Sequence, residues 1–373
     1  MSVAPHRPTI LIVEDEVGPR NALQVILRPF YNLQTVDNGR EALEILKEER
    51  IDLITLDMKL PDRYGLDLLQ QVKAEHQDVE VVVITGYGSL QSAMDSVRYG
   101  AAAYLLKPFN VTELLAIINQ ALNKKQRLEV LRQYLAGPDS LWATEEEAAE
   151  SWGQLKRRYQ DVRSQVKGDA PSADAADITP LLAELLEAYD RELFNHSNRT
   201  SFYAAFLGKQ LTLTESERKA LPLGAFLHDI GSLALTRSTG RLDGENRQGD
   251  LLHHPEIGAR MILPLGLPAE VGQIILYHHE RYDGSGYPYG LQGEGIPLLA
   301  RIVSIAQAFD HLTAEHGTQQ PLGVEEAIHR IREEAGSRFD PGITELLARG
   351  VRESATSLPT LAASSRHSFI PEL

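Results

Sequence analysis

Short apolar runs alternate with amphipathic stretches over the first third of the chain, and this alternation constrains the fold more than any other feature. The apolar runs are TILIV at 9–13, DLITL at 52–56, VEVVVIT at 79–85 and AAYLL at 102–106. Between them, REALEILKEE and GLDLLQQVKAE repeat apolar residues at helical spacing. Such strand–helix units predict an α/β doubly wound fold, in which helices cover both faces of a parallel sheet.

Polar residues directly follow these predicted strands, at the edge where such sheets carry their sites. They are Glu14 and Asp15, Asp57, Thr85 and Lys107. One acid at such a place is commonly a turn residue or a helix cap. Three carboxylates at one edge repel each other unless a cation neutralises them, and Mg²⁺ prefers oxygen ligands. The joint pattern therefore predicts a magnesium site.

Residues 8–124 resemble a response-regulator receiver domain through IVEDE, LDMKLPDRYGLDLL, ITGYGS and LLKPF. The resemblance implies a five-stranded parallel sheet and phosphotransfer to Asp57 from a sensor histidine kinase or a small phosphodonor. It implies that Asp57 acts as a carboxylate nucleophile beside Mg²⁺. The other implied roles are Mg²⁺ binding by Glu14 and Asp15 together with Asp57, phosphoryl binding by Thr85 and Lys107, and a rotating switch aromatic at Tyr104.

Residues 125–177 are predicted to form a helical connector followed by a flexible linker. A stripe of Leu128, Leu131 and Leu135 fits two roles, a dimerising coiled coil or packing against a neighbouring domain. The small polar stretch KGDAPSADAADITP is typical of a flexible linker. We expect a homodimer, and a disordered tail over 351–373 because that segment is rich in Ser and Ala.

Composition excludes several classes of protein. The chain has 52 acidic against 37 basic residues and a formal net charge of −15, which disfavours binding to nucleic acid. It has no cysteine, so a metal ion must rely on histidine and carboxylate ligands. No signal-like segment or apolar run of about 18 residues is present, and we expect a cytoplasmic protein without a membrane partner.

Residues 178–350 repeat apolar positions at helical spacing and predict an all-α bundle. Within it, Glu192 and His196 are four residues apart and therefore share one helix face. His228 and Asp229 end the apolar stretch LPLGAFLHDIG. A single histidine is most often an ordinary core or surface residue, so His253 is given no role.

The remaining histidines of this pattern are His254, in HHPEIG, and the pair His278 and His279, in HHERYDGSGYP. Imidazoles combined with carboxylates suit ions such as Fe, Mn, Ni or Zn. A carboxylate that bridges two ions holds them about 3.5–4 Å apart and can activate water for attack on a phosphoester. The cluster therefore predicts a metal-dependent hydrolytic site.

The motifs HDIG, HHP, HHERYDGSGYP and ARIVSIAQAFDHLTA, in this order, resemble the HD-GYP branch of the HD phosphohydrolases. The resemblance implies a helical bundle that hydrolyses cyclic di-GMP with two or three divalent ions. The metal ligands that it implies are Glu192, His196, His228, Asp229, His254, His278 and His279, with Asp229 bridging. It also implies that Asp283 supports the loop, while Gly284 and Gly286 allow close approach of the backbone.

Three places depart from the family pattern. The last metal ligand, an aspartate in the family, is Gln307, whose neutral amide can coordinate through oxygen but supplies no charge. The lysine after HDIG is Ser232, and an Arg/Lys-containing segment is replaced by HGTQ at 316–319. At these last two places, the cations that would meet substrate phosphates are therefore missing.

Two interpretations of the output domain follow. In the first, phosphorylation of Asp57 controls a metal-dependent phosphodiesterase that hydrolyses cyclic di-GMP or a related phosphoester. In the second, a catalytically weak HD-GYP domain binds a ligand or a signalling protein, as the departures at Gln307 and Ser232 would suggest. In both, we expect the phosphoryl group to bias a two-state equilibrium.

Overall fold

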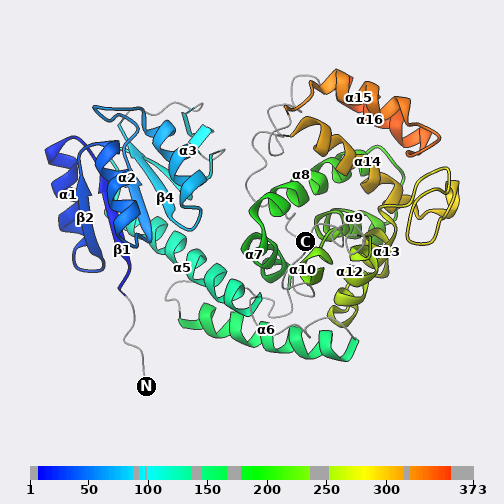
Figure 1. The fold of residues 1–373 in the computed structure, drawn as a ribbon, viewed down its shortest axis with the longest axis horizontal. Coiled ribbons are helices and arrows are strands. Elements are labelled where there is room, and N and C mark those ends of the chain that lie inside the picture. Colours follow the sequence, from blue (N-terminus) through cyan, green and yellow to red (C-terminus); the bar gives the residue numbers. More distant parts are fainter. Residues whose placement is uncertain are drawn as a thin grey trace. The chain divides into compact units, whose positions relative to one another are not determined.

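The structure is a computed structural model, and its chain divides into two compact units, Met1–Arg127 and Leu128–Leu373 (Figure 1). The described residues are 7–86, 92–93, 95–96, 99–135, 145–165, 178–235, 252–314 and 320–353. Among them, no helix combines the length and the apolar character that crossing a bilayer requires.

The first unit contains a parallel sheet of five strands in the order β2-β1-β3-β4-β5, as predicted. The strands are β1 (Thr9–Val13), β2 (Asn32–Val36), β3 (Leu53–Leu56), β4 (Glu80–Thr85) and β5 (Ala103–Leu106). The helices are α1 (Val17–Leu27), α2 (Gly39–Glu48), α3 (Gly65–Glu75) and α5 (Val111–Leu135). Two separate apolar clusters lie on the two faces, one with α2 and α3 and the other with α1 and α5.

The burial of each strand explains whether the sequence pattern predicts it. All residues of β3 are buried, and so are four of the five in β1, which gives the continuous apolar runs typical of a sheet covered on both faces. In β2, only Val36 is buried, because this strand lies at the edge of the sheet. Its sequence NLQTV has no apolar run, and none was identified there.

Helix α5 contributes to the cores of both units. Its first half buries Leu114 and Ile118 in the receiver core, whereas Leu128, Leu131 and Leu135 are buried in the core of the second unit. The leucine stripe therefore packs inside this chain and is not available for a dimerising coiled coil. Residues 167–177 of the predicted linker and residues 354–373 of the predicted tail lie outside the described residues, whereas Thr179, Pro180 and residues 351–353, predicted as linker and tail, are helical.

In its described part, the elements of the second unit are all helices, joined by loops, and the all-α prediction is confirmed. After α6 (Glu145–Gln165), its elements are α7 (Thr179–Tyr189), α8 (Arg191–Gly208), α9 (Glu215–Leu227), α10 (Ser232–Leu235), α12 (His254–Ile262), η1 (Leu263–Leu265), α13 (Ala269–Tyr277), η2 (Gly293–Gly295), α14 (Leu298–Thr313), α15 (Val324–Glu333) and α16 (Pro341–Glu353). Helix α8 packs against α9 and α14, and α13 packs against α9.

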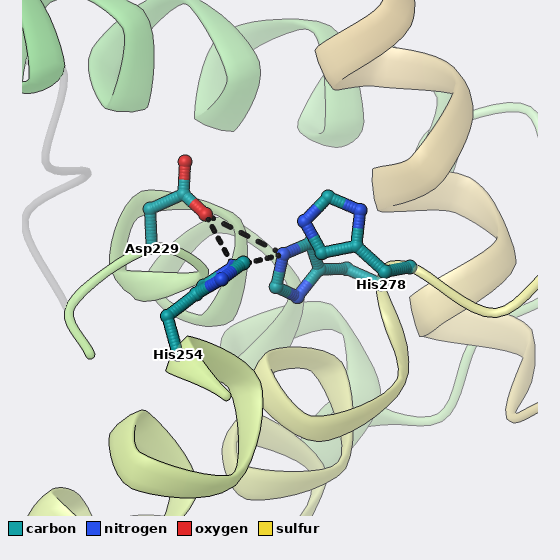
Figure 2. A group of neighbouring side chains, drawn as sticks. Asp229, His254 and His278 are labelled. Atoms are coloured by element: carbon teal, nitrogen blue, oxygen red, sulfur yellow. Dashed lines mark hydrogen bonds and ion pairs between the residues drawn. The ribbon is translucent and has the colours of Figure 1, made fainter. Parts of the chain in front are cut away.

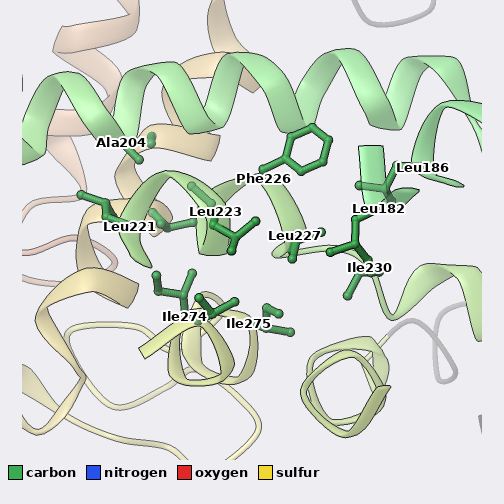
Figure 3. Packing of buried hydrophobic residues seen from close by; sticks show 14 of the residues in the cluster. Leu182, Leu186, Ala204, Leu221, Leu223, Phe226, Leu227, Ile230, Ile274 and Ile275 are labelled. Atoms are coloured by element: carbon green, nitrogen blue, oxygen red, sulfur yellow. The ribbon is translucent and has the colours of Figure 1, made fainter. Parts of the chain in front are cut away.

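Capping and apolar packing fix the two helices that carry much of the site. The Asp190 side chain accepts hydrogen bonds from two backbone amides at the start of α8, and Thr214 and Glu217 form a reciprocal capping box at the start of α9. Figure 3 shows apolar side chains of α9 between α8 and α13, with Phe226 directed toward α8. The rings of Phe226 and Phe194 meet edge to face. These contacts hold α9 against its neighbours.

Helix α6 belongs to the helical unit, because Trp152 is only 2% exposed and its Nε1 donates a hydrogen bond of 2.7 Å to the Met261 carbonyl. We predict that Trp152→Ala lowers the free energy of unfolding of this unit by about 3–5 kcal/mol, as expected for loss of a large buried aromatic side chain. Denaturant unfolding would measure the change, with Arg157→Ala on the exposed side of α6 as the control. Equal midpoints for the two variants would contradict the packing of α6.

Candidate functional site

The first candidate site lies at the carboxyl edge of the parallel sheet. Ligand atoms of Glu14, Asp15 and Asp57 lie within 4.8 Å of one another. The Nζ atom of Lys107 lies 2.5 Å from Asp57 Oδ2 and 2.6 Å from Glu14 Oε2. Thr85 is fully buried at the end of β4. The Lys107 backbone amide donates to the Thr85 carbonyl at 2.9 Å, so Thr85 lies at the same edge as the three carboxylates and the lysine.

The donor set at this edge fits Mg²⁺. The Oε1 atom of Glu14 is buried and has no hydrogen-bond partner, so a hard cation would satisfy it. Burial raises the pKa of Glu14, and Lys107 opposes that shift only in part. Burial also acts against the Lys107 ammonium, but hydrogen bonds to Asp57 and Glu14 outweigh it and raise the pKa of Lys107. The lysine therefore stays charged beside Asp57. Tyr104, the predicted switch aromatic, has its hydroxyl 3.0 Å from Ser92 Oγ.

The second candidate site is a cluster of imidazoles around one carboxylate in the helical unit. Several of its residues stand at helix ends, because His228 and Asp229 follow α9, His254 begins α12, and His278 and His279 follow α13. His196 comes from within α8. Ligand atoms fall into two groups that share Asp229, one with His254, His278 and His279, the other with His196 and His228.

The two oxygens of Asp229 face different histidines. Oδ1 lies 3.0 Å from His254 Nε2 and 3.4 Å from His278 Nε2 (Figure 2). Oδ2 lies 3.2 Å from His228 Nε2. Oδ1 therefore faces one ligand group and Oδ2 faces the other. A carboxylate that bridges two ions requires this arrangement.

The hydrogen bonds made by the Nδ1 atoms determine whether each Nε2 atom carries a proton or a lone pair. His228 Nδ1 donates to the Ala225 carbonyl at 2.7 Å, and His278 Nδ1 donates to the Ile275 carbonyl at 2.8 Å. A carbonyl oxygen only accepts, so in the neutral rings Nε2 carries a lone pair. His196 Nδ1 lies 2.7 Å from Asp310 Oδ2, and its Nε2 lies 3.3 Å from His228 Nε2. Lone pairs that converge in this way fit divalent ions.

The pKa shifts of His196 and His278 agree with this assignment. Burial lowers the pKa of His196, and it lowers the pKa of His278 to about 4, so both rings are neutral near pH 7. Despite burial, the charge and hydrogen bonds of His228 hold the pKa of Asp229 well below its usual value. Burial also opposes the charge on His228, but Asp229 outweighs it and raises the pKa of His228. A proton on His228 can therefore offset the negative charge of Asp229, as a metal ion would.

Two glycines allow the segments of the site to approach each other. A Cβ atom on Gly231, in HDIG, would lie 2.0 Å from the His254 carbonyl, so only glycine lets this turn touch the start of α12. A Cβ atom on Gly286 would lie 2.2 Å from the backbone nitrogen of Arg281. Asp283 accepts hydrogen bonds from the Ser285 backbone and hydroxyl, so it holds the same loop.

Three of the predicted positions lie differently from the others. The Glu192 side chain is exposed, and its carboxylate belongs to neither ligand group among the described residues, although it shares a helix with His196. Gln307 is 5% exposed, and its Nε2 donates a hydrogen bond of 3.2 Å to the His278 carbonyl. Ser232 begins α10, where its carbonyl accepts from the Tyr189 hydroxyl. The segment 316–319 lies outside the described residues.

Several residues that were not predicted as metal ligands shape this cluster. Asp310 is fully buried and contacts both His196 and the Arg199 guanidinium, so it orients the histidine. The spacing of Arg199, three residues after His196, could have indicated this. Glu280 is 3% exposed, and its two oxygens accept from the backbone amides of Tyr289 and Leu291, which fixes the loop after His279.

Together, a receiver sheet with a phosphoacceptor edge and a helical unit with a histidine–aspartate cluster define a response regulator with an HD-type output domain. Family models match the chain as a response regulator receiver domain over residues 10–119 and as an HD domain over residues 180–343.

Curated relatives match nearly the whole chain. The "Cyclic di-GMP phosphodiesterase response regulator RpfG" of Xanthomonas campestris is 29% identical over 91% of this chain and 87% of its own length. A Vibrio cholerae protein named "Probable cyclic di-GMP phosphodiesterase" is 30% identical over 90% of this chain and 76% of its own. The "Cyclic di-GMP phosphodiesterase" of Thermotoga maritima is 28% identical over 92% and 91%. The chain belongs to this family of response regulators with an N-terminal receiver domain and a C-terminal HD-GYP domain.

The contact between Asp310 and His196 predicts an effect on metal binding. Asp310→Asn removes the charge that orients His196 and leaves Arg199 without its carboxylate, so we expect the affinity for the weaker bound ion to fall about 10–100-fold. Calorimetric titration of the metal-depleted protein with Zn²⁺ would measure it, with the exposed Glu294→Gln as the control. An unchanged isotherm for Asp310→Asn would mean that His196 does not depend on this carboxylate to bind metal.

Proposed function

We propose that this protein is a phosphorylation-controlled, metal-dependent phosphodiesterase that hydrolyses cyclic di-GMP. The observation that carries the proposal is the sharing of Asp229 by two imidazole groups, with one carboxylate oxygen facing each group. The names of the three relatives supply the substrate, because each contains cyclic di-GMP phosphodiesterase. They also favour the enzymatic interpretation over a catalytically weak binding module.

In this proposal, the ligands would be the two groups around Asp229, and the ions, when bound, would supply Lewis acidity and an activated water. The buried His228 and His278 keep fixed tautomers through their carbonyl partners, so their Nε2 atoms need no reorganisation. The His279 ring stacks on Tyr287 at 4.8 Å, which restrains it on the loop side. Burial and the charge of Asp229 raise the pKa of Tyr287 to about 12, so its hydroxyl remains a hydrogen-bond donor.

In the receiver, Asp57 would be the nucleophile that accepts the phosphoryl group from a sensor kinase. Its Oδ1 accepts from the Lys59 backbone amide at 3.1 Å, while Oδ2 contacts Lys107. The amide and the ammonium would then stabilise charge on the transferred group, as Mg²⁺ held by Glu14 and Asp15 would. The relatives' names do not identify the kinase.

We predict that the purified full-length protein, loaded anaerobically with Fe²⁺ or Mn²⁺, converts cyclic di-GMP to the linear dinucleotide or GMP, as measured by chromatography. Asp229→Asn removes the charge shared by both groups, and the rate should fall to background. His253→Ala is the matched control, because this exposed histidine neighbours a ligand but belongs to neither group. Tight dinucleotide binding by the native protein without hydrolysis would instead support the binding-module interpretation.

We also predict that acetyl phosphate and Mg²⁺ add one phosphoryl group to the protein, measured by intact mass. Asp57→Asn should prevent the adduct, and chelation of Mg²⁺ should do the same, whereas Asp67→Asn on the exposed side of α3 should not. The hydrolysis rate should then differ between phosphorylated and unphosphorylated protein. Identical rates and identical mass in both states would argue against control by the receiver.

A further inference from the structure

The last turns of helix α5 are hydrogen-bonded to two other helices of the second unit. The Nε atom of Arg132 donates to the Ala188 carbonyl, near the end of α7, at 3.2 Å. The hydroxyl of the buried Tyr134 donates to the Ser151 carbonyl in α6 at 2.9 Å. Residues two apart on a helix point in nearly opposite directions, so these contacts lie on opposite sides of α5.

The contact of α5 with α7 leads to the residue that both ligand groups share. Tyr189 follows Ala188 in the chain, and its hydroxyl donates to the Ser232 carbonyl at 2.9 Å. The Ser232 backbone amide donates in turn to the Asp229 carbonyl at 3.0 Å, within the turn after α9. A first route of hydrogen bonds and one peptide linkage therefore joins α5 to the turn that carries the Asp229 carboxylate.

The contact of α5 with α6 leads to a helix that begins with a ligand. Trp152 follows Ser151, and its Nε1 donates to the Met261 carbonyl of α12 at 2.7 Å. His254 is the first residue of α12, and its Nε2 lies 3.0 Å from Asp229 Oδ1 (Figure 2). This second route therefore ends on a direct partner of the residue that the first route reaches.

The other half of α5 belongs to the receiver. Leu114 and Ile118 are buried in the receiver core, and Lys125 Nζ lies 3.0 Å from Asp52 Oδ1. Asp52 directly precedes β3, and Asp57 directly follows it. Because α5 is one continuous helix, a displacement of its receiver half would act on the two contacts at its end.

We propose that α5 transmits the phosphorylation state of the receiver to the Asp229 cluster through the hydrogen bonds of Arg132 and Tyr134. The two routes would favour one spacing between the turn after α9 and α12, and the phosphoryl group would shift the population of that arrangement. Ligands must keep their mutual distances to hold an ion, so a small displacement of either element is sufficient to affect the site. This inference rests on the receiver control in the proposed function and adds the residues through which that control acts.

The test measures amide hydrogen exchange of the full-length protein, with and without Mg²⁺ and beryllium fluoride, a stable mimic of the phosphoryl group. In the native protein, we expect exchange in the turn after α9 and in α12 to change about fivefold or more, as for ordinary coupling between sites. Asp57→Asn should abolish both changes.

Two single variants separate the two routes. Arg132→Met keeps the aliphatic stem and removes the donor to α7, so the response should be lost mainly in the turn after α9. Tyr134→Phe keeps the ring and removes the donor to α6, so the response should be lost mainly in α12. Gln133→Ala, at an exposed position between them, is the control and should respond as the native protein does. Cooperative thermal unfolding of each variant would show that a lost response is not a lost fold.

Responses of Arg132→Met and Tyr134→Phe that equal those of the native protein would overturn the proposal and leave both hydrogen bonds a packing role. The same holds if neither segment of the native protein responds although acetyl phosphate adds a phosphoryl group to Asp57. Exchange is measured without substrate, so a failure to hydrolyse cyclic di-GMP would overturn the proposed function and leave this inference standing. A phosphorylation-dependent hydrolysis rate that persists in both variants would do the reverse.

Discussion

The convergence of acceptor atoms on Asp229 is the constraint on which the helical unit depends. Backbone carbonyls accept the Nδ1 protons of His228 and His278, so the buried Nε2 atoms of both rings face the Asp229 carboxylate. Without a cation or a proton, such an arrangement would be repulsive and poorly solvated. The raised pKa of His228 and the depressed pKa of Asp229 express the same imbalance.

The bundle is built to hold these atoms in place. Apolar contacts hold α9 against α8 and α13, and most of the ligands stand at or just beyond the ends of these and neighbouring helices. Gly231 then lets the turn after α9 touch the start of α12, because any larger residue would collide with the His254 carbonyl. The positions of the ligand side chains therefore depend on the packing of the core, and a change in helix packing would move these side chains.

The receiver also brings like-charged groups together, and there a lysine side chain offsets part of their charge. Its carboxylates meet at the edge of a parallel sheet, and the Lys107 ammonium already contacts two of them. The buried Oε1 atom of Glu14 has no hydrogen-bond partner, so the lysine alone does not satisfy all the carboxylate oxygens at this edge. Helix α5 contributes buried residues to the receiver core and to the helical core, so one continuous element is part of both units.

The sequence by itself determined the two fold classes, because apolar runs and helical periodicity follow directly from burial in a covered sheet and in a bundle. It also indicated most of the site residues, since ligand types and spacings such as HHERYDGSGYP are local. It did not reveal the edge strand β2, whose residues are mostly half-buried, or decide between the two roles of the leucine stripe. Only the tertiary structure showed Glu192 outside the ligand groups, and Asp310 and His311 beside His196. Those relations join helices far apart in the sequence, and side-chain direction across such a distance is set by packing rather than by local pattern.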